Sequence, residues 1–220
     1  MDIYYLMDFT ATMRKVKTIM QSAAESIANK IKYLTKDYKI GFGSFNEKQE
    51  VPYSLDIENV QNEKVCSQHY IHSGGSYVCY PANHCLQSQI FPQKPNYAFQ
   101  HHMELTRNIP ELKTDLNKIG ICTHMIGNID HPEAALEGMA QAMLCPTVVG
   151  WRNHTTKVII VISDDQQHYA MDGVMGGLFD NFNVNSDCKT NGTGHYDKNE
   201  ELKLDYPSFG QVLKFFYNCL

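Results

Sequence analysis

The chain has 220 residues, of which 43% are hydrophobic and 20% are charged. That composition is too apolar for a disordered protein and too interrupted by polar residues for a membrane-spanning one. Its 19 basic and 24 acidic residues give a formal charge of -5, so nucleic acid is not an expected partner. We expect a soluble globular domain, because a chain of this length can bury a large core without disulfide staples.

The first part of the sequence alternates between strand and helix patterns. Residues 3–7 form an unbroken apolar run, which is typical of a strand buried on both faces of a parallel sheet. Between residues 13 and 34, apolar side chains recur every three or four positions and predict an amphipathic helix. Residues 38–45 alternate and contain two glycines, which predicts a second strand. A strand, a helix and a strand in this order begin a doubly wound unit.

The rest of the chain is less regular. Residues 54–98 have no sustained period, and a loop of that length inside a domain usually has a function. A short polar helix is expected at 110–118, and a second helix is expected to begin at Pro132 and continue through Met143. Residues 158–162 predict the most hydrophobic strand, and a last helix is expected from 207 to 216.

Acidic side chains cluster at three places, each at the end of a predicted strand or in a following turn: residues 8–12, 128–133 and 163–165. In an open α/β sheet these ends line one crevice, so the clusters are expected to meet there. Carboxylate and hydroxyl oxygens suit Mg²⁺, Mn²⁺ or Ca²⁺. The candidate ligands are Asp8, Thr10, Thr12, Glu133 and Asp164. The simpler alternative is that Asp8 and Thr10 only cap the helix that follows.

Several segments match a pattern that extends along the whole chain: DIYYLMDFTATM at 2–13, IGFGSF at 40–45, GNIDHPE at 127–133, GWRN at 150–153, DG at 172–173 with GG at 176–177, and DYPS at 205–208. Their order and spacing resemble the I-like domain of integrin beta subunits. The resemblance implies a von Willebrand factor A-type fold with a doubly wound, mostly parallel sheet flanked by helices. It also implies that residues 1–220 are one partial domain of a divergent member, truncated at its C-terminal end.

The resemblance implies two cation sites. A metal-ion-dependent adhesion site for Mg²⁺ or Mn²⁺ would be built from Asp8, Thr10, Thr12, Glu133 and Asp164. The family usually has serines where Thr10 and Thr12 stand, and a threonine hydroxyl can serve as the same ligand. A synergistic Ca²⁺ site would be built from Glu47, Asn128, Asp130, the Pro132 carbonyl and Glu133. Glu133 would bridge the two ions.

The family's third, regulatory ion site is incomplete in this sequence. That site takes two consecutive carboxylates just after the first acidic cluster, and the corresponding positions here are Lys15 and Val16. One positive and one neutral side chain therefore replace two negative charges. We expect that no ion binds at this position and that the Lys15 ammonium lies near it.

The function implied by the resemblance is that of a cell-adhesion receptor subunit rather than an enzyme. An Asp or Glu side chain of an extracellular ligand would complete the coordination of the adhesion-site cation, and the partner would be an integrin alpha subunit. The chain would lie on the extracellular face of the plasma membrane, attached through parts outside this sequence, because neither a signal peptide nor a transmembrane segment is recognisable in it. Two acceptor sequences for N-glycosylation, at Asn153 and Asn191, are compatible with that location.

Residues 54–98 correspond by resemblance to the specificity-determining loop of the family, which is longer here. We expect Cys66 to pair with Cys79 or Cys85, because loop cysteines in secreted proteins usually form disulfides. A zinc clip is the alternative, since two pairs have metal-ligand spacing: Cys66 with His69, and His84 with Cys85.

By resemblance, Cys145 pairs with Cys188, which leaves Cys122 and Cys219 without an assigned partner. The remaining histidines are scattered, so we interpret His101, His102 and His168 as surface or hydrogen-bonded core residues rather than ligands. The single tryptophan, Trp151, is interpreted as a packing residue.

Two other functions fit parts of the sequence. An Asp-x-Thr-x-Thr segment after a buried strand also resembles the haloacid dehalogenase phosphatases, in which the first aspartate is the nucleophile and Mg²⁺ is bound nearby. Thr10 stands where those enzymes need a proton-donating acid. A stand-alone von Willebrand factor A module that binds ligand without an alpha subunit is the other alternative. The turn at 127–133 and the long loop favour the integrin type.

Overall fold

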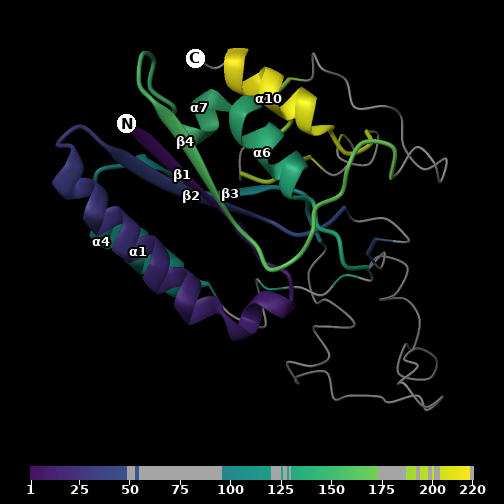
Figure 1. Cartoon of the computed structure of the whole chain (residues 1–220), viewed down its shortest axis with the longest axis horizontal. Helices are drawn as coiled ribbons and strands as arrows, with labels where there is room; N and C mark the ends of the chain where they lie inside the picture. Colours follow the sequence, from purple (N-terminus) through teal and green to yellow (C-terminus); the bar gives the residue numbers. More distant parts are fainter. Residues whose placement is uncertain are drawn as a thin grey trace.

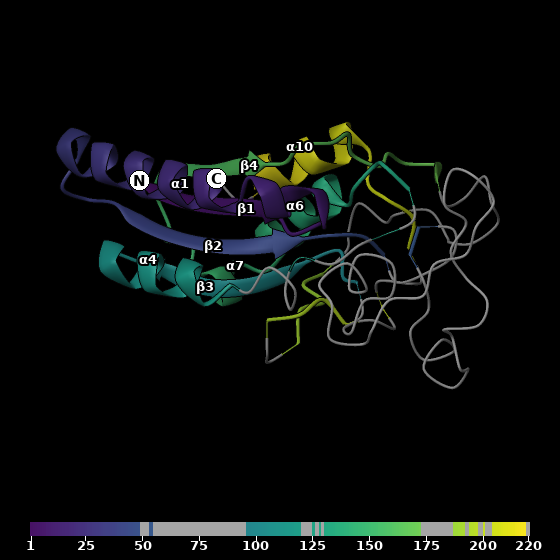
Figure 2. The ribbon, with the colours of Figure 1, turned by 90° about the horizontal axis from the view of Figure 1, so that it is seen from below.

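A four-stranded, mostly parallel sheet organises the chain, whose computed structural model describes residues 1–48, 53–54, 96–119, 125, 128, 130–172, 187–191, 194–197, 200 and 204–218. Its strands are β1 (Asp2–Asp8), β2 (Lys39–Phe45), β3 (Gln100–Thr106) and β4 (Lys157–Ile162). They follow the order β3-β2-β1-β4 (Figure 2). β1 is parallel to both β2 and β4, whereas β3 is antiparallel to β2. The predicted doubly wound, mostly parallel sheet is confirmed.

Helices cover both faces of this sheet (Figure 1). One face carries α1 (Lys17–Leu34) and α4 (Ile109–Lys118), which also contact each other. The opposite face carries α6 (Ala135–Leu144), α7 (Pro146–Val149) and α10 (Phe209–Asn218). Within that layer α6 contacts β1, β2 and α10, and α7 contacts β3. The central strand therefore has a helical layer on each side, which is the arrangement that parallel sheets require.

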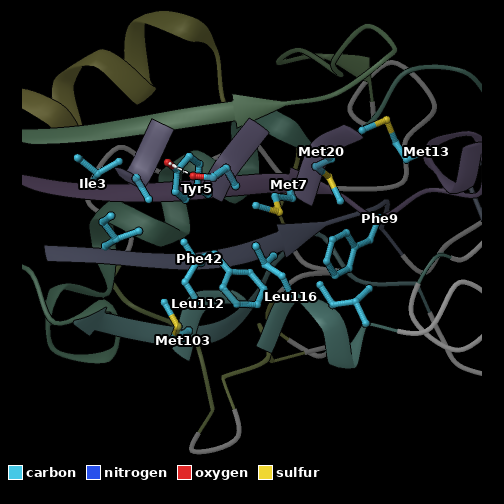
Figure 3. Packing of buried hydrophobic residues seen from close by; sticks show 14 of the residues in the cluster. Ile3, Tyr5, Met7, Phe9, Met13, Met20, Phe42, Met103, Leu112 and Leu116 are labelled. Carbon is cyan, nitrogen blue, oxygen red and sulfur yellow. Dashed lines mark hydrogen bonds between the residues drawn. The ribbon is translucent and has the colours of Figure 1, made fainter. Parts of the chain in front are cut away.

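β1 shows why the sheet is central, because all seven of its residues are buried. Ile3, Tyr5 and Met7 face the layer of α1 and α4 (Figure 3), where the Tyr5 hydroxyl donates to the carbonyl of Ala24 in α1 at 3.0 Å. Tyr4 and Leu6 belong to the core on the opposite face. The alternation along one strand thus feeds two cores, as an apolar run without polar interruptions predicts.

The structure corrects several element boundaries. The expected helix at 13–34 is divided into a 3-10 turn at Thr12–Lys15 and α1, because Val16 has φ -104° and ψ 3° and interrupts the helix. The second helix begins at Ala135 rather than at Pro132, because Glu133 forms a parallel bridge with Gln167. The last helix begins at Phe209 rather than at 207.

Two elements were not predicted. β3 has the sequence QHHMELT, in which Met103 and Leu105 are the buried residues, so its apolar pattern is too short to identify a strand from sequence. α7 is a single turn that follows Cys145 and ends at Gly150, whose φ of 83° requires glycine. The bulk of residues 54–98 lies outside the described residues.

Gly43 in β2 tests how tightly the sheet is packed. A Cβ added at Gly43 would lie 2.7 Å from the backbone oxygen of Gln100 in β3 and would also collide with the Tyr4 hydroxyl. We predict that Gly43→Ala lowers the free energy of unfolding by about 1–3 kcal/mol, because backbone cannot move aside cheaply. Urea unfolding of the variant measures this loss.

The matched control is Gly210→Ala in α10, where the nearest atom to an added Cβ is the Ser208 hydroxyl at 3.9 Å. Alanine is favoured over glycine inside a helix, so this variant should be as stable as the wild type or slightly more stable. Equal losses for the two variants would contradict the close contact between β2 and β3.

Candidate metal centre

The predicted acidic ligands come together at the carboxyl edge of the parallel strands. Asp8 is the last residue of β1, Glu47 follows β2, and Asp164 follows β4. The segment that contains Glu133 precedes α6 and lies beside the residues that follow β2 and β4. These residues are distant in sequence, and they meet because parallel strands present their carboxyl ends at the same edge.

Asp8, Thr10, Thr12 and Asp164 form a continuous series of polar contacts. One carboxylate oxygen of Asp8 accepts from the N–H of Thr10 at 2.7 Å, and the other accepts from the hydroxyl of Ser163 at 2.7 Å. The hydroxyls of Thr10 and Thr12 lie 3.1 Å apart, and the Thr12 hydroxyl donates to Asp164 Oδ1 at 3.0 Å. Asp8 and Thr10 are buried, whereas Thr12 and Asp164 are exposed. The group therefore opens to solvent on one side.

Backbone hydrogen bonds hold Glu133 beside this group. Its N–H donates to the carbonyl of Gln166 at 2.8 Å, and its carbonyl accepts from the N–H of His168 at 2.9 Å. The next residue, Ala134, donates to the carbonyl of Asn46 at 2.9 Å. Glu133 is thereby fixed between the segment that follows β2 and the segment that follows β4.

Burial makes the carboxyl groups of this site difficult to ionise without a cation. It raises the pKa of Asp8 to about 6, against the lowering effect of hydrogen bonds from Thr10 and Ser163. Burial raises the pKa of Glu133 to about 12, and the charges of Asp8 and Glu47 add to the shift. A bound divalent cation would stabilise both ionised forms, so the donor set fits a metal ion.

The second predicted set is centred on a residue that the sequence analysis did not place there. Glu47 is buried, and its Oε1 accepts a hydrogen bond from the Tyr206 hydroxyl. Its Oε2 lies 3.2 Å from Nε2 of His168, and Oδ2 of Asp130 lies 3.0 Å from the same nitrogen. The other ring nitrogen of His168 lies 2.8 Å from Oδ2 of Asp172. His168 thus stands among three carboxylates.

The remaining members of that set lie next to this cluster. Asn128 donates from Nδ2 to Oε2 of Glu133 at 3.0 Å, and Pro132 is half-buried immediately before Glu133. Burial on its own lowers the pKa of His168, but its hydrogen bonds with Asp130 and Glu47 raise that pKa to about 10. The spacing of His168 and Asp172, four residues apart, was the sequence signal that could have linked the histidine to an acid.

A buried ion pair supports Glu47 from behind. Nζ of Lys48 lies 2.7 Å from Oε2 of Glu137 in α6, and both side chains are 0% exposed. The ammonium also lies 5.1 Å from the centre of the Tyr206 ring. Burial raises the pKa of Glu137 to about 7 even though Lys48 acts in the opposite direction. Sequence analysis missed this pair, because nothing in the pattern of α6 marks Glu137 as a core residue.

The position of the family's third ion site carries basic residues. Lys15 is exposed at the end of the 3-10 turn, and Val16 is half-buried before α1. The neighbouring Arg14 donates from Nε to the carbonyl of Met125 at 3.1 Å. A guanidinium and an ammonium therefore lie where the family's pattern has carboxylates.

The predicted disulfide between Cys145 and Cys188 is confirmed and joins the end of α6 to the segment at residues 187–191. Asn153 and Asn191 are both exposed. Trp151 packs against Tyr4 and donates to the carbonyl of Ala142 at 2.9 Å, as a packing residue should. The pairing of Cys66 with Cys79 or Cys85 falls outside the described residues. Among the described helices, none is long and apolar enough to cross a membrane.

Lys48 allows a test of the buried ion pair. We predict that Lys48→Met lowers the free energy of unfolding by about 3–5 kcal/mol, because it leaves the Glu137 carboxyl buried without its cation. The double variant Lys48→Met/Glu137→Leu should recover part of that loss. The control is Lys113→Met, which removes a pair with Glu25 whose side chains are 57% and 35% exposed and should change stability by less than about 1 kcal/mol. Equal losses in urea unfolding would refute the predicted difference.

Comparison with known proteins gives a consistent result. The chain matches the family "Integrin beta chain VWA domain" over residues 1–218. It is 28% identical over 211 residues to "Integrin beta pat-3" of Caenorhabditis elegans, covering 94% of this chain and 22% of that protein. It is 28% identical over 213 residues to "Integrin beta-7" of Mus musculus, covering 96% of this chain and 22% of that protein.

A third relative, "Integrin beta-2" of Bos taurus, is 29% identical over 214 residues, covering 96% of this chain and 23% of that protein. The chain therefore spans less than a quarter of the length of these relatives. Its α/β sheet is the fold expected of such a domain. The chain belongs to the integrin beta family, in which it matches the von Willebrand factor A-type domain.

Proposed function

We propose that this chain is the ligand-binding domain of a cell-adhesion receptor subunit and that it binds an acidic side chain of an extracellular ligand through a divalent cation. The cation would be Mg²⁺ or Mn²⁺, held by Asp8, Thr10, Thr12, Glu133 and Asp164. The observation that carries the proposal is the contact series from buried Asp8 through the two threonine hydroxyls to exposed Asp164. Such a series offers oxygen ligands on the protein side and leaves the solvent side for a ligand carboxylate.

A second cation position would lie next to the first. We propose that Glu47, Asn128, Asp130, the Pro132 carbonyl and Glu133 contribute to it, with Glu133 shared between the two positions. The electrostatic effect of both Asp8 and Glu47 on Glu133 supports this sharing. Ca²⁺ is the ion that the resemblance assigns there, and the chemistry of that position is developed below.

The assembly is proposed from the relatives. They are integrin beta proteins, so we propose an integrin alpha subunit as the partner and the extracellular face of the plasma membrane as the location. The exposed glycosylation sequence at Asn153 and the disulfide of Cys145 with Cys188 are compatible with an oxidising compartment. Neither the phosphatase nor the stand-alone module is needed to account for these features.

Metal-dependent stability tests the proposed adhesion site. Mg²⁺ or Mn²⁺ should raise the unfolding temperature of the chain above its value in EDTA, because each ion binds the native state only. At 100 times the dissociation constant, one ion adds about 2.7 kcal/mol to the free energy of unfolding. Differential scanning calorimetry measures the shift, and Asp8→Ala should abolish the response to Mg²⁺.

The control for this experiment is Asp115→Ala, which removes a carboxylate of α4 that pairs with Lys118 at the surface. It should retain the full Mg²⁺ response. A folded wild-type chain whose unfolding temperature is the same in Mg²⁺, Mn²⁺ and EDTA would show that the acidic clusters are architectural.

A gain of function tests the proposed loss of the third ion. The double variant Lys15→Asp/Val16→Asp restores two consecutive carboxylates after the 3-10 turn, and we predict that it binds one more Mn²⁺ per chain than the wild type. Equilibrium dialysis followed by elemental analysis measures the number of bound ions. The matched control is Lys17→Asp/Thr18→Asp on the first turn of α1, which adds the same charge elsewhere and should leave the number unchanged. A wild-type chain that already binds three ions would contradict the prediction.

A further inference from the structure

His168 holds its position through contacts with chain segments that are far apart in sequence. Its Nε2 lies 3.2 Å from Oε2 of Glu47, which follows β2, and 3.0 Å from Oδ2 of Asp130, which precedes α6. These three ligand atoms all lie within 4.8 Å of one another. Neighbouring ligand atoms around a metal ion with bonds of about 2.0–2.2 Å are about 3.0–3.4 Å apart, so the separations from Nε2 suit a small divalent cation.

The orientation of the imidazole is fixed by its other nitrogen. Nδ1 lies 2.8 Å from Oδ2 of Asp172, and that oxygen is itself fixed by the N–H of Tyr169 at 2.9 Å. A carboxylate on one ring nitrogen, with the other nitrogen directed at the ligands, is the usual arrangement of a metal-binding histidine. Asp172 therefore has the place of an outer-sphere partner.

Aromatic rings restrict the imidazole further. The ring of Tyr206 stacks on that of His168 at 4.4 Å between centres, and the ring of Tyr53 meets it edge-on at 4.8 Å. The histidine is 4% exposed, so it cannot swing out to solvent. A side chain held on both nitrogens and both faces is preorganised for one position of Nε2.

The polar atoms that face this point are incompletely satisfied. Oε2 of Glu47 and Oδ1 of Asp130 are buried and have no hydrogen-bond partner among the described residues. Nε2 approaches both carboxylates at ion-pair distance without hydrogen-bond geometry to either. Buried carboxylate oxygens without a donor are costly, and a cation bound between the three side chains would satisfy them.

We propose that Glu47, Asp130 and His168 form a mixed nitrogen and oxygen site for a borderline divalent cation such as Zn²⁺ or Mn²⁺, with Asp172 positioning the histidine. The inference rests on the second cation position of the proposed function and changes its chemistry. Ca²⁺ takes oxygen ligands, whereas imidazole nitrogen suits Zn²⁺ and related metals. The second position should therefore prefer Zn²⁺ and Mn²⁺ to Ca²⁺.

The first test is pulsed electron paramagnetic resonance of the full chain loaded with Mn²⁺. We expect modulation from a directly bound nitrogen in the wild type and its loss in His168→Gln, which cannot supply an imidazole. The control is His154→Asn, an exposed histidine before β4 whose φ of 58° asparagine tolerates. Nitrogen modulation that persists in His168→Gln, or that is absent from wild type with two bound Mn²⁺, would overturn the proposal.

A second variant guards against a folding defect in His168→Gln. Asp172→Asn keeps the histidine but weakens its orientation, so Zn²⁺ affinity measured by isothermal titration calorimetry should fall about 10–100-fold. Unchanged Zn²⁺ affinity in both variants would contradict the assignment. Asp8→Ala separates this inference from the adhesion site, because it should remove the Mg²⁺ response while nitrogen modulation remains. Loss of the nitrogen signal alone, with the Mg²⁺ response intact, would leave the adhesion site standing.

Discussion

The structure depends on how buried carboxylates are compensated at the edge of a parallel sheet. Asp8, Glu47, Glu133 and Glu137 are each at most 3% exposed, and a buried charge is tolerated only when it is paired or bound to a metal. Glu137 has the ammonium of Lys48, and Glu47 has His168. The compensation is therefore uneven across the edge.

Asp8 and Glu133 are the groups that make a cation necessary. The side-chain contacts described for Asp8 come from Thr10 and Ser163, and those for Glu133 come from Asn128. These donors are neutral, and burial holds the pKa of Asp8 at about 6 and that of Glu133 at about 12. A divalent ion would supply the missing positive charge and would turn an electrostatic weakness into a binding site open to a ligand carboxylate.

Much of this arrangement could be predicted from the sequence, because its signals are local. The apolar run of β1, the helical period of α1 and the oxygen-bearing residues after each strand all identify an α/β sheet with ligands at one edge. β3 escaped prediction because its seven residues include two histidines and only two buried apolar side chains. Its place in the sheet comes from pairing with β2, which is a tertiary effect.

The supporting residues of the site could not be predicted for a similar reason. Ser163, Lys48 and His168 gain their roles from partners far away in the chain, at Asp8, Glu137 and Glu47 respectively. The isolated bridge of Glu133 with Gln167 also depends on tertiary contacts, and it moved the start of α6 past the proline that marked it in the sequence. Local patterns identify such ligands, whereas the contacts that orient them come only from the fold.

The most direct measurement is anomalous diffraction from crystals of the chain grown with Mn²⁺. The account predicts one peak within bonding distance of Asp8 and the hydroxyls of Thr10 and Thr12, and a second among Glu47, Asp130 and His168. An ordered structure with the same side-chain positions and no peak beside Asp8 and Glu133 would contradict the claim that a cation compensates these buried carboxylates.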